Sequence, residues 1–190
     1  MTFNFEEKDS CGVGFIASRG VPRTHGMTLK ILECLSNLDH RGAKFADGTG
    51  DGAGVLTEIP FELLEAEISE RGIIRNESSK LALISCFFDP KNVTESMELI
   101  DSKLEEFDIE LLYWRKVPTD KEILGTMAKE SKPGIYQAII CSTKEYKYKF
   151  EKYLYLFRKS LETDLAKNEF LNIHILSLIH ISEPTRRKRI

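Results

Sequence analysis

The residue near the start of the sequence with the clearest chemical potential is Cys11, which separates a polar leader from an apolar stretch. The leader MTFNFEEKDS (residues 1–10) is followed by CGVGFIAS, whose composition favours a strand. A cysteine thiol becomes a nucleophile when a base accepts its proton. If residues 1–10 were removed, the new α-amine of Cys11, with a pKa of about 8, could act as that base. The alternative is an ordinary buried thiol at the start of a strand.

A second group of candidate residues lies in LDHRGAKFADGTGDGAG, residues 38–54. His40 and Arg41 could place a cation near an anionic group, or they could be basic residues that favour the end of a helix. The glycine-rich part indicates a loop whose backbone adopts positive φ angles or closely approaches another group. We name this part the glycine loop; it contains Gly48, Gly50, Asp51, Gly52 and Gly54.

The sequence also contains an apparent dinucleotide-binding pattern and a possible set of metal ligands, and neither is supported by its sequence context or spacing. The pattern G-x-G-x-x-A occurs at residues 12–17 and 48–53, but a dinucleotide site needs a helix after the glycines, and both segments lead into predicted strands. A metal site would need short spacings between ligands. We expect no metal site because such spacings are absent among the four candidates Cys11, His25, Cys34 and His40.

The composition is typical of a soluble globular protein. The chain has 190 residues, of which 42% are hydrophobic and 30% charged, and no apolar run approaches the roughly 18–20 residues of a membrane span. The net charge of −3 gives no electrostatic argument for nucleic acid. Four scattered cysteines without a C-x-x-C pair, and no secretory signal, predict free thiols in a reducing compartment, the cytoplasm.

Strand-like and helix-like patterns alternate along the chain and predict one α+β unit. No repeat and no linker divides it. The predicted helices cover residues 27–38, 61–72, 93–107, 120–129 and 147–162. The predicted strands cover residues 11–18, 54–60, 81–88, 109–117, 135–142 and 169–175.

The end of the chain has an unusual pattern. The stretch LSLIHISEPTR, residues 176–186, resembles, at every codon, the translation of a transposon-based sequencing adapter. Such segments are excluded from reasoning about a fold. We therefore expect the natural sequence to stop near Ile175, with residues 176–190, including their basic cluster, derived from the adapter.

Three motifs in order, DSCGVGFIA, LSNLDHRGA and ADGTGDGAG, resemble the start of the class II glutamine amidotransferase domain of the glutamate synthase large subunit. The resemblance continues through LYWRKVPTD, KPGIYQAII and YLYLFRKSLE. It implies the αββα sandwich of the N-terminal-nucleophile (Ntn) hydrolases, incomplete here because the chain is truncated. It also implies a propeptide at residues 1–10 and the N-terminal part of the amidotransferase domain at residues 11–175.

The resemblance further implies that Cys11 attacks the side-chain carboxamide of glutamine while its own α-amine moves the proton. The products are glutamate and ammonia. His40, Arg41 and Gly42 match the segment beside the nucleophile, and the glycine loop matches one that packs near it. The substrate-binding arginine, the Asn-Gly oxyanion hole and the acidic residue that reads the substrate amine are expected downstream, so we expect little activity from this chain alone.

In a complete enzyme of this family, ammonia would pass to a distant site where 2-oxoglutarate is reductively aminated. That chemistry implies FMN, an iron–sulfur cluster and either a small subunit or ferredoxin as partner, none of them bound by this part of the protein. Two alternatives stay open. One is another class II amidotransferase, resembling asparagine synthetase or amidophosphoribosyltransferase, against which TGDGAG argues; the other is a non-catalytic interaction module.

Overall fold

A computed structural model gives the fold of the chain. Its contacts divide the chain into two compact units, one formed by Met1–Glu58 with Asp120–Ser131 and the other by Ile59–Thr119 with Lys132–Ile190. We call them the first and the second unit. The structure describes residues 12–17, 19, 24–38, 40, 42, 46–50, 52–57, 59–76, 78–144, 149–167 and 173–180, the last range as backbone only.

The second unit contains an antiparallel sheet of four strands in the order β2-β3-β1-β4. These strands are β1 (Lys80–Phe88), β2 (Glu110–Lys116), β3 (Gly134–Ser142) and β4 (Ile173–His180). The register places Leu83 of β1 opposite Ile139 of β3, and Ile84 opposite Leu178 of β4. β1 and β3 are the interior strands, which explains their long apolar runs.

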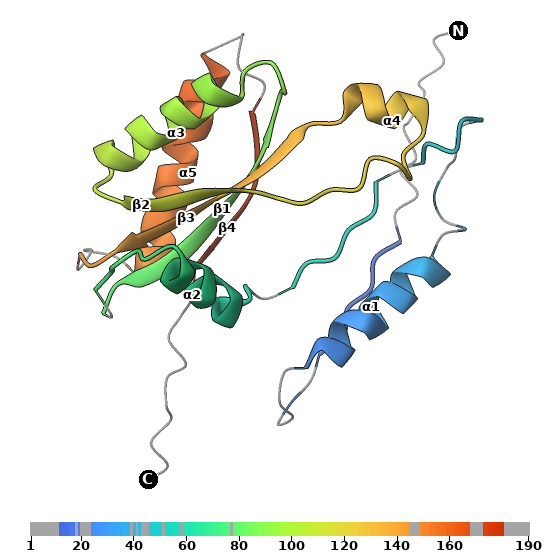
Figure 1. The fold of residues 1–190 in the computed structure, drawn as a ribbon, viewed down its shortest axis with the longest axis horizontal. Coiled ribbons are helices and arrows are strands. Elements are labelled where there is room, and N and C mark those ends of the chain that lie inside the picture. Colours follow the sequence, from blue (N-terminus) through green and yellow to red (C-terminus); the bar gives the residue numbers. More distant parts are fainter. Residues whose placement is uncertain are drawn as a thin grey trace, which may run out of the picture. The chain divides into compact units, whose positions relative to one another are not determined.

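Helices cover both faces of this sheet (Figure 1). α3 (Val93–Glu106) and α5 (Phe150–Ala166) pack on one face, and α2 (Phe61–Glu70) packs on the other. A strand that is buried on both sides reads as a continuous apolar run and not as an alternation. This accounts for LALISCFF in β1, where Ile84, Cys86 and Phe88 are completely buried.

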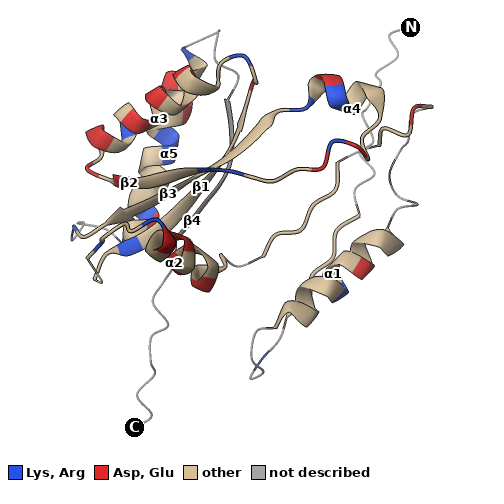
Figure 2. Ribbon diagram, in the orientation of Figure 1, with Lys and Arg blue, Asp and Glu red and all other residues tan. Residues whose placement is uncertain are grey.

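The helices of the second unit form where apolar residues recur at helical spacing. In α5, Phe150, Leu154, Phe157 and Leu161 are all buried, and each such side chain contributes about 1.5–3 kcal/mol on leaving water. α2 buries Leu64 and Ile68 against the opposite face of the sheet. α2 and α3 each carry several acidic residues along their length (Figure 2).

Several predicted elements are confirmed, with boundaries shifted by a few residues. α2, α3, α5, β1, β2 and β3 all occupy their predicted segments. The last strand was predicted over residues 169–175, whereas β4 continues to His180 because the alternating LSLI stretch is also suited to pairing. A strand in this position does not bear on the origin of residues 176–180, and the adapter interpretation stays a prediction.

In the described part of the first unit, the helices are α1 (His25–Asn37) and α4 (Thr126–Ser131). α1 confirms the helix predicted over residues 27–38. The helix predicted over residues 120–129 was placed too early: Asp120 instead accepts the N–H of Glu122 at 2.9 Å. This local bond offers the backbone an alternative to helix, so α4 begins only at Thr126.

Two strand predictions in the first unit are wrong. Residues 12–17, and the described part of the segment 54–60, are not in strands. Strand propensity in these segments expresses itself only beside a partner strand. Val13 and Phe15 are 90% and 88% exposed, and Leu56 is 81% exposed. The observed architecture is therefore mixed α and β, with one small antiparallel sheet among the described residues.

Candidate functional site

The segment after α1 carries two residues of the predicted site, His40 and Gly42. α1 ends at Asn37, and the His40 Nδ1 atom lies 3.0 Å from the Asn37 carbonyl oxygen. The ring therefore donates through Nδ1 to a carbonyl at the helix end. Both His40 and Gly42 are exposed. His40 thus has a structural contact and still presents its ring to solvent.

Gly48 meets the backbone requirement predicted for the glycine loop. Gly48 has φ +82°, a conformation that costs other residues roughly 1–2 kcal/mol. The prediction is wrong for Gly52 and Gly54: neither has a positive φ, and a Cβ atom on either would meet nothing within 4 Å. Their backbone, as described, would accept a side chain.

Asp47, which is not among the predicted site residues, organises the start of the glycine loop. Its Oδ1 accepts the Thr49 N–H at 3.0 Å, and its Oδ2 accepts the Thr49 hydroxyl at 2.9 Å. Oδ2 also accepts the N–H of Met127, in the first turn of α4, at 3.0 Å. These hydrogen bonds, that of Met127 first, hold the pKa of the Asp47 carboxyl below its usual value.

Three predicted site residues, Cys11, Arg41 and Asp51, lie outside the described residues. Among the residues that the structure does describe, no hydrogen bond joins His40 or Gly42 to the glycine loop. In the same described part of the chain, no three His, Cys, Asp or Glu side chains are placed to hold a metal ion. The proposed role of Cys11 therefore rests on sequence and on comparison.

The second unit contains a polar network between α2 and β2. Glu67 accepts the Tyr113 hydroxyl at 2.9 Å and the Arg115 guanidinium at 2.9 Å, while Arg71 lies 4.4 Å from the centroid of the Tyr113 ring. Burial, followed by the hydrogen bond to Glu67, raises the pKa of Tyr113 to about 12. This network holds α2 on the sheet. It also explains why two charged residues, Glu67 and Arg115, lie between the helix and β2.

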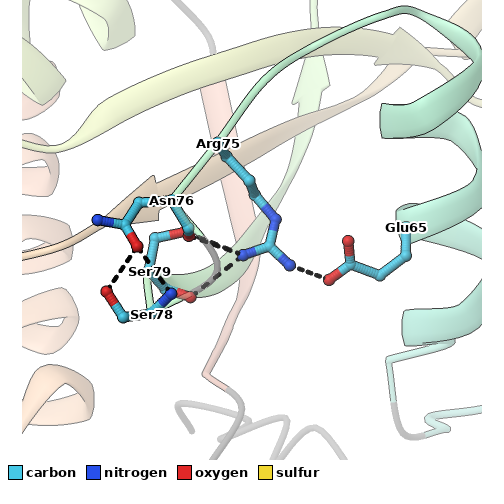
Figure 3. Close-up of polar contacts among 5 residues, drawn as sticks. All are labelled: Glu65, Arg75, Asn76, Ser78 and Ser79. Atoms are coloured by element: carbon cyan, nitrogen blue, oxygen red, sulfur yellow. Dashed lines mark hydrogen bonds and ion pairs between the residues drawn. The ribbon is translucent and has the colours of Figure 1, made fainter.

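A second network shapes the turn between α2 and β1 (Figure 3). Arg75 donates to the carbonyl oxygen of Asn76 at 3.3 Å, to the Ser79 hydroxyl at 3.0 Å, and forms an ion pair with Glu65 of α2. Asn76 in turn accepts the N–H and hydroxyl of Ser78. The described hydrogen bonds and ion pair of Arg75 all go to residues of this turn and of α2, which indicates a structural role.

The described thiols differ sharply in their surroundings. Cys34 is exposed, whereas Cys86 and Cys141 are buried on opposite faces of the sheet. Burial raises the pKa of Cys86 to about 12 and that of Cys141 to about 11. Because only the thiolate is nucleophilic, neither buried thiol is suited to catalysis.

No helix in the described part of the chain has both the length and the apolar character to cross a membrane.

Comparison with known proteins identifies relatives over most of the chain. Ferredoxin-dependent glutamate synthase of Pyropia yezoensis is 35% identical over 164 residues, which is 86% of this chain and 11% of that protein. Glutamate synthase [NADH] of Saccharomyces cerevisiae is 34% identical over 173 residues, 84% of this chain and 8% of the relative. Ferredoxin-dependent glutamate synthase 2 of Synechocystis is 32% identical over 175 residues, which is 87% of this chain and 11% of that protein.

The chain spans about a tenth of the length of these relatives. The sequence profile of one family, described as "Glutamine amidotransferases class-II", matches residues 11–182. This match begins at Cys11 and covers nine tenths of the chain, with most of both units. The chain therefore belongs to the class II glutamine amidotransferases.

Proposed function

We propose that this chain is the N-terminal part of the glutaminase domain of a glutamate synthase. Cys11, freed by removal of residues 1–10, is the nucleophile that hydrolyses glutamine to glutamate and ammonia. The observation that carries the proposal is that the family match begins at Cys11, the first residue after the predicted leader. The relatives named glutamate synthase support the choice within the family.

The reaction requires a thiolate and a proton carrier on one residue. The α-amine of Cys11, with a pKa of about 8, takes the thiol proton as the sulfur attacks the carboxamide carbon. The carbon–nitrogen bond then breaks, and the departing nitrogen leaves as ammonia with that proton. Water hydrolyses the resulting thioester, which releases glutamate and restores the thiol. His40 and Arg41, with Gly42 and the glycine loop, border this site in the proposal.

The proposal assigns activity to a longer protein. The relatives extend far beyond the matched part, and the first unit leaves large apolar side chains uncovered, Ile123 at 81% exposure as well as Val13 and Phe15. A second sheet of an αββα Ntn sandwich would give these side chains a partner surface. Truncation by an adapter-derived tail from residue 176 is part of the same proposal, as is a cytoplasmic location.

We assign the flavin and iron–sulfur chemistry of a complete glutamate synthase to parts of the protein outside this chain. An iron–sulfur cluster needs several cysteine thiolates on one site. Cys86 and Cys141 lie on opposite faces of the sheet, so these two thiols cannot share a cluster. Ferredoxin, or a small subunit that carries electrons from a nicotinamide cofactor, is the proposed partner of the complete enzyme.

The test uses the full-length protein, obtained after an independent reading of the source DNA downstream of the codon for Phe170. Intact mass establishes whether Met1–Ser10 is absent, and release of ammonia from glutamine measures glutaminase activity. We expect processing and activity in the parent, and loss of nearly all activity in Cys11→Ala. Cys34→Ser, which removes an exposed thiol, is the matched control and should keep full activity.

Two results would refute the proposal. A full-length protein that is unprocessed and inactive would favour the non-catalytic interaction module. A genomic sequence that ends with LSLIHISEPTRRKRI would refute the adapter interpretation and leave Cys11 without the downstream residues that the family implies.

A further inference from the structure

The glycine loop is joined to a segment far along the chain by one carboxylate. Asp47 and Thr49 of the loop and Met127 of α4 all belong to the first unit. Asp47 accepts three hydrogen bonds, from the Thr49 N–H, the Thr49 hydroxyl and the Met127 N–H, at 2.9–3.0 Å. The last of these spans 80 residues of sequence. It is therefore a tertiary contact and not a local turn.

A glycine on the opposite side of this contact makes it possible. A Cβ atom on Gly125 would lie 2.8 Å from the Asp47 carbonyl oxygen and 2.9 Å from its Oδ2, and closer still to the Thr49 hydroxyl. Atoms this close must move apart, and all three belong either to backbone or to short side chains that hydrogen bonds hold in place. Gly125 is therefore required for close approach, a role glycine fills because it lacks a side chain.

We propose that Asp47 is a positioning residue of the glutaminase site. Its carboxylate ties the glycine loop to residues 125–127 and so fixes the shape in which the loop borders the nucleophile. This inference rests on the proposed function, because the loop is assigned to the site by its match to the family. We call the set Asp47, Thr49, Gly125 and Met127 the loop clamp.

The charge of Asp47 is essential to the loop clamp. Its Oδ2 accepts two hydrogen bonds at once, which an ionised carboxylate does readily. In Asp47→Asn, an amide nitrogen would face either the Met127 N–H or the N–H of Thr49, and two donors would then oppose each other. Hydrogen bonds to a charged acceptor are also stronger than those to a neutral one. The variant therefore tests the clamp with almost no change of shape.

The first measurement is amide hydrogen exchange, followed by mass spectrometry on the 190-residue chain. In Asp47→Asn we expect exchange to rise about tenfold or more in peptides covering residues 46–50 and residues 123–131. Gly125→Ala should produce the same two changes without altering any charge. Asp120→Asn is the matched control, because Asp120 is in the same unit and accepts one local N–H; exchange of the glycine loop should be unchanged.

The second measurement is kcat/KM for glutamine in the full-length protein. Misplacement of a group by about 1 Å can cost roughly 100-fold in rate, and we expect a loss of this order in Asp47→Asn and Gly125→Ala. Thr49→Val should lose activity, whereas Thr49→Ser, which keeps the hydroxyl, should retain most of the parental kcat/KM. Asp120→Asn should retain the parental value.

Each outcome separates the clamp from the proposed function. Unchanged exchange in Asp47→Asn overturns the clamp whatever the activity. Faster exchange that extends equally over α1, residues 25–37, also overturns it, because Asp47 would then stabilise the whole unit. Faster exchange confined to the two peptides, with parental kcat/KM, overturns the positioning role alone. A parent without glutaminase activity refutes the proposed function and the positioning role, while exchange still decides whether the clamp exists.

Discussion

The hydroxyl of Tyr113 contributes a stability whose size depends on pH. Tyr113 is 8% exposed, and its hydroxyl donates to Glu67 at 2.9 Å. A hydrogen bond to a charged group is worth about 1.5–3 kcal/mol, so Tyr113→Phe should lower the free energy of unfolding by about 2 kcal/mol at pH 7. The ring and its contact with Arg71 are retained, so little packing is lost.

The same hydroxyl should make the parental chain sensitive to alkali. Burial raises the pKa of Tyr113 from 10.0 to about 12 in the folded state. A folded-state pKa above the unfolded value gives stability that is complete below pH 10 and is lost as the pH rises towards 12. For these two values the loss between pH 9 and pH 11 is about 1.3 kcal/mol. Tyr113→Phe lacks this loss.

The assay is urea unfolding of the parent and of Tyr113→Phe at pH 7, 9 and 11. The difference between their free energies of unfolding should narrow by about 1.3 kcal/mol between pH 9 and pH 11. In a separate titration of the folded proteins, the tyrosinate absorbance that the parent has and Tyr113→Phe lacks should appear near pH 12. Tyr155→Phe is the control, because Tyr155 is 56% exposed and such changes stay within about 0.5 kcal/mol. A difference that stays constant with pH would refute the reasoning.

Two further predictions concern the core of the second unit and the thiols. Phe157 is completely buried and meets Phe107 edge to face at 5.5 Å, so Phe157→Ala should cost about 3–5 kcal/mol in urea unfolding, with Phe157→Leu clearly milder. Iodoacetamide at pH 8, with labelled peptides mapped by mass spectrometry, should modify Cys34 in the native chain and spare Cys86 and Cys141, because burial raises the pKa of both buried thiols. Rapid native labelling of Cys86 would contradict its described burial.

The sequence determined the elements of the second unit because their signals are local. Phe150, Leu154, Phe157 and Leu161 recur at helical spacing, and the run LALISCFF is apolar throughout. Such patterns record which side chains must leave water, and the sheet and its helices follow from them. The family motifs were equally readable, since Cys11 and the glycine loop lie in short contiguous stretches.

The first unit needed tertiary information. The strand predicted over residues 11–18 failed because strand propensity does not say whether a partner strand is present, and Val13 and Phe15 are exposed in the structure. Asp47 was missed for the opposite reason: an Asp-Gly pair reads as an ordinary turn. Only the fold brings Gly125 and Met127 to it, the latter across 80 residues. Local patterns determine what a segment prefers, and long-range contacts determine which partner it finds.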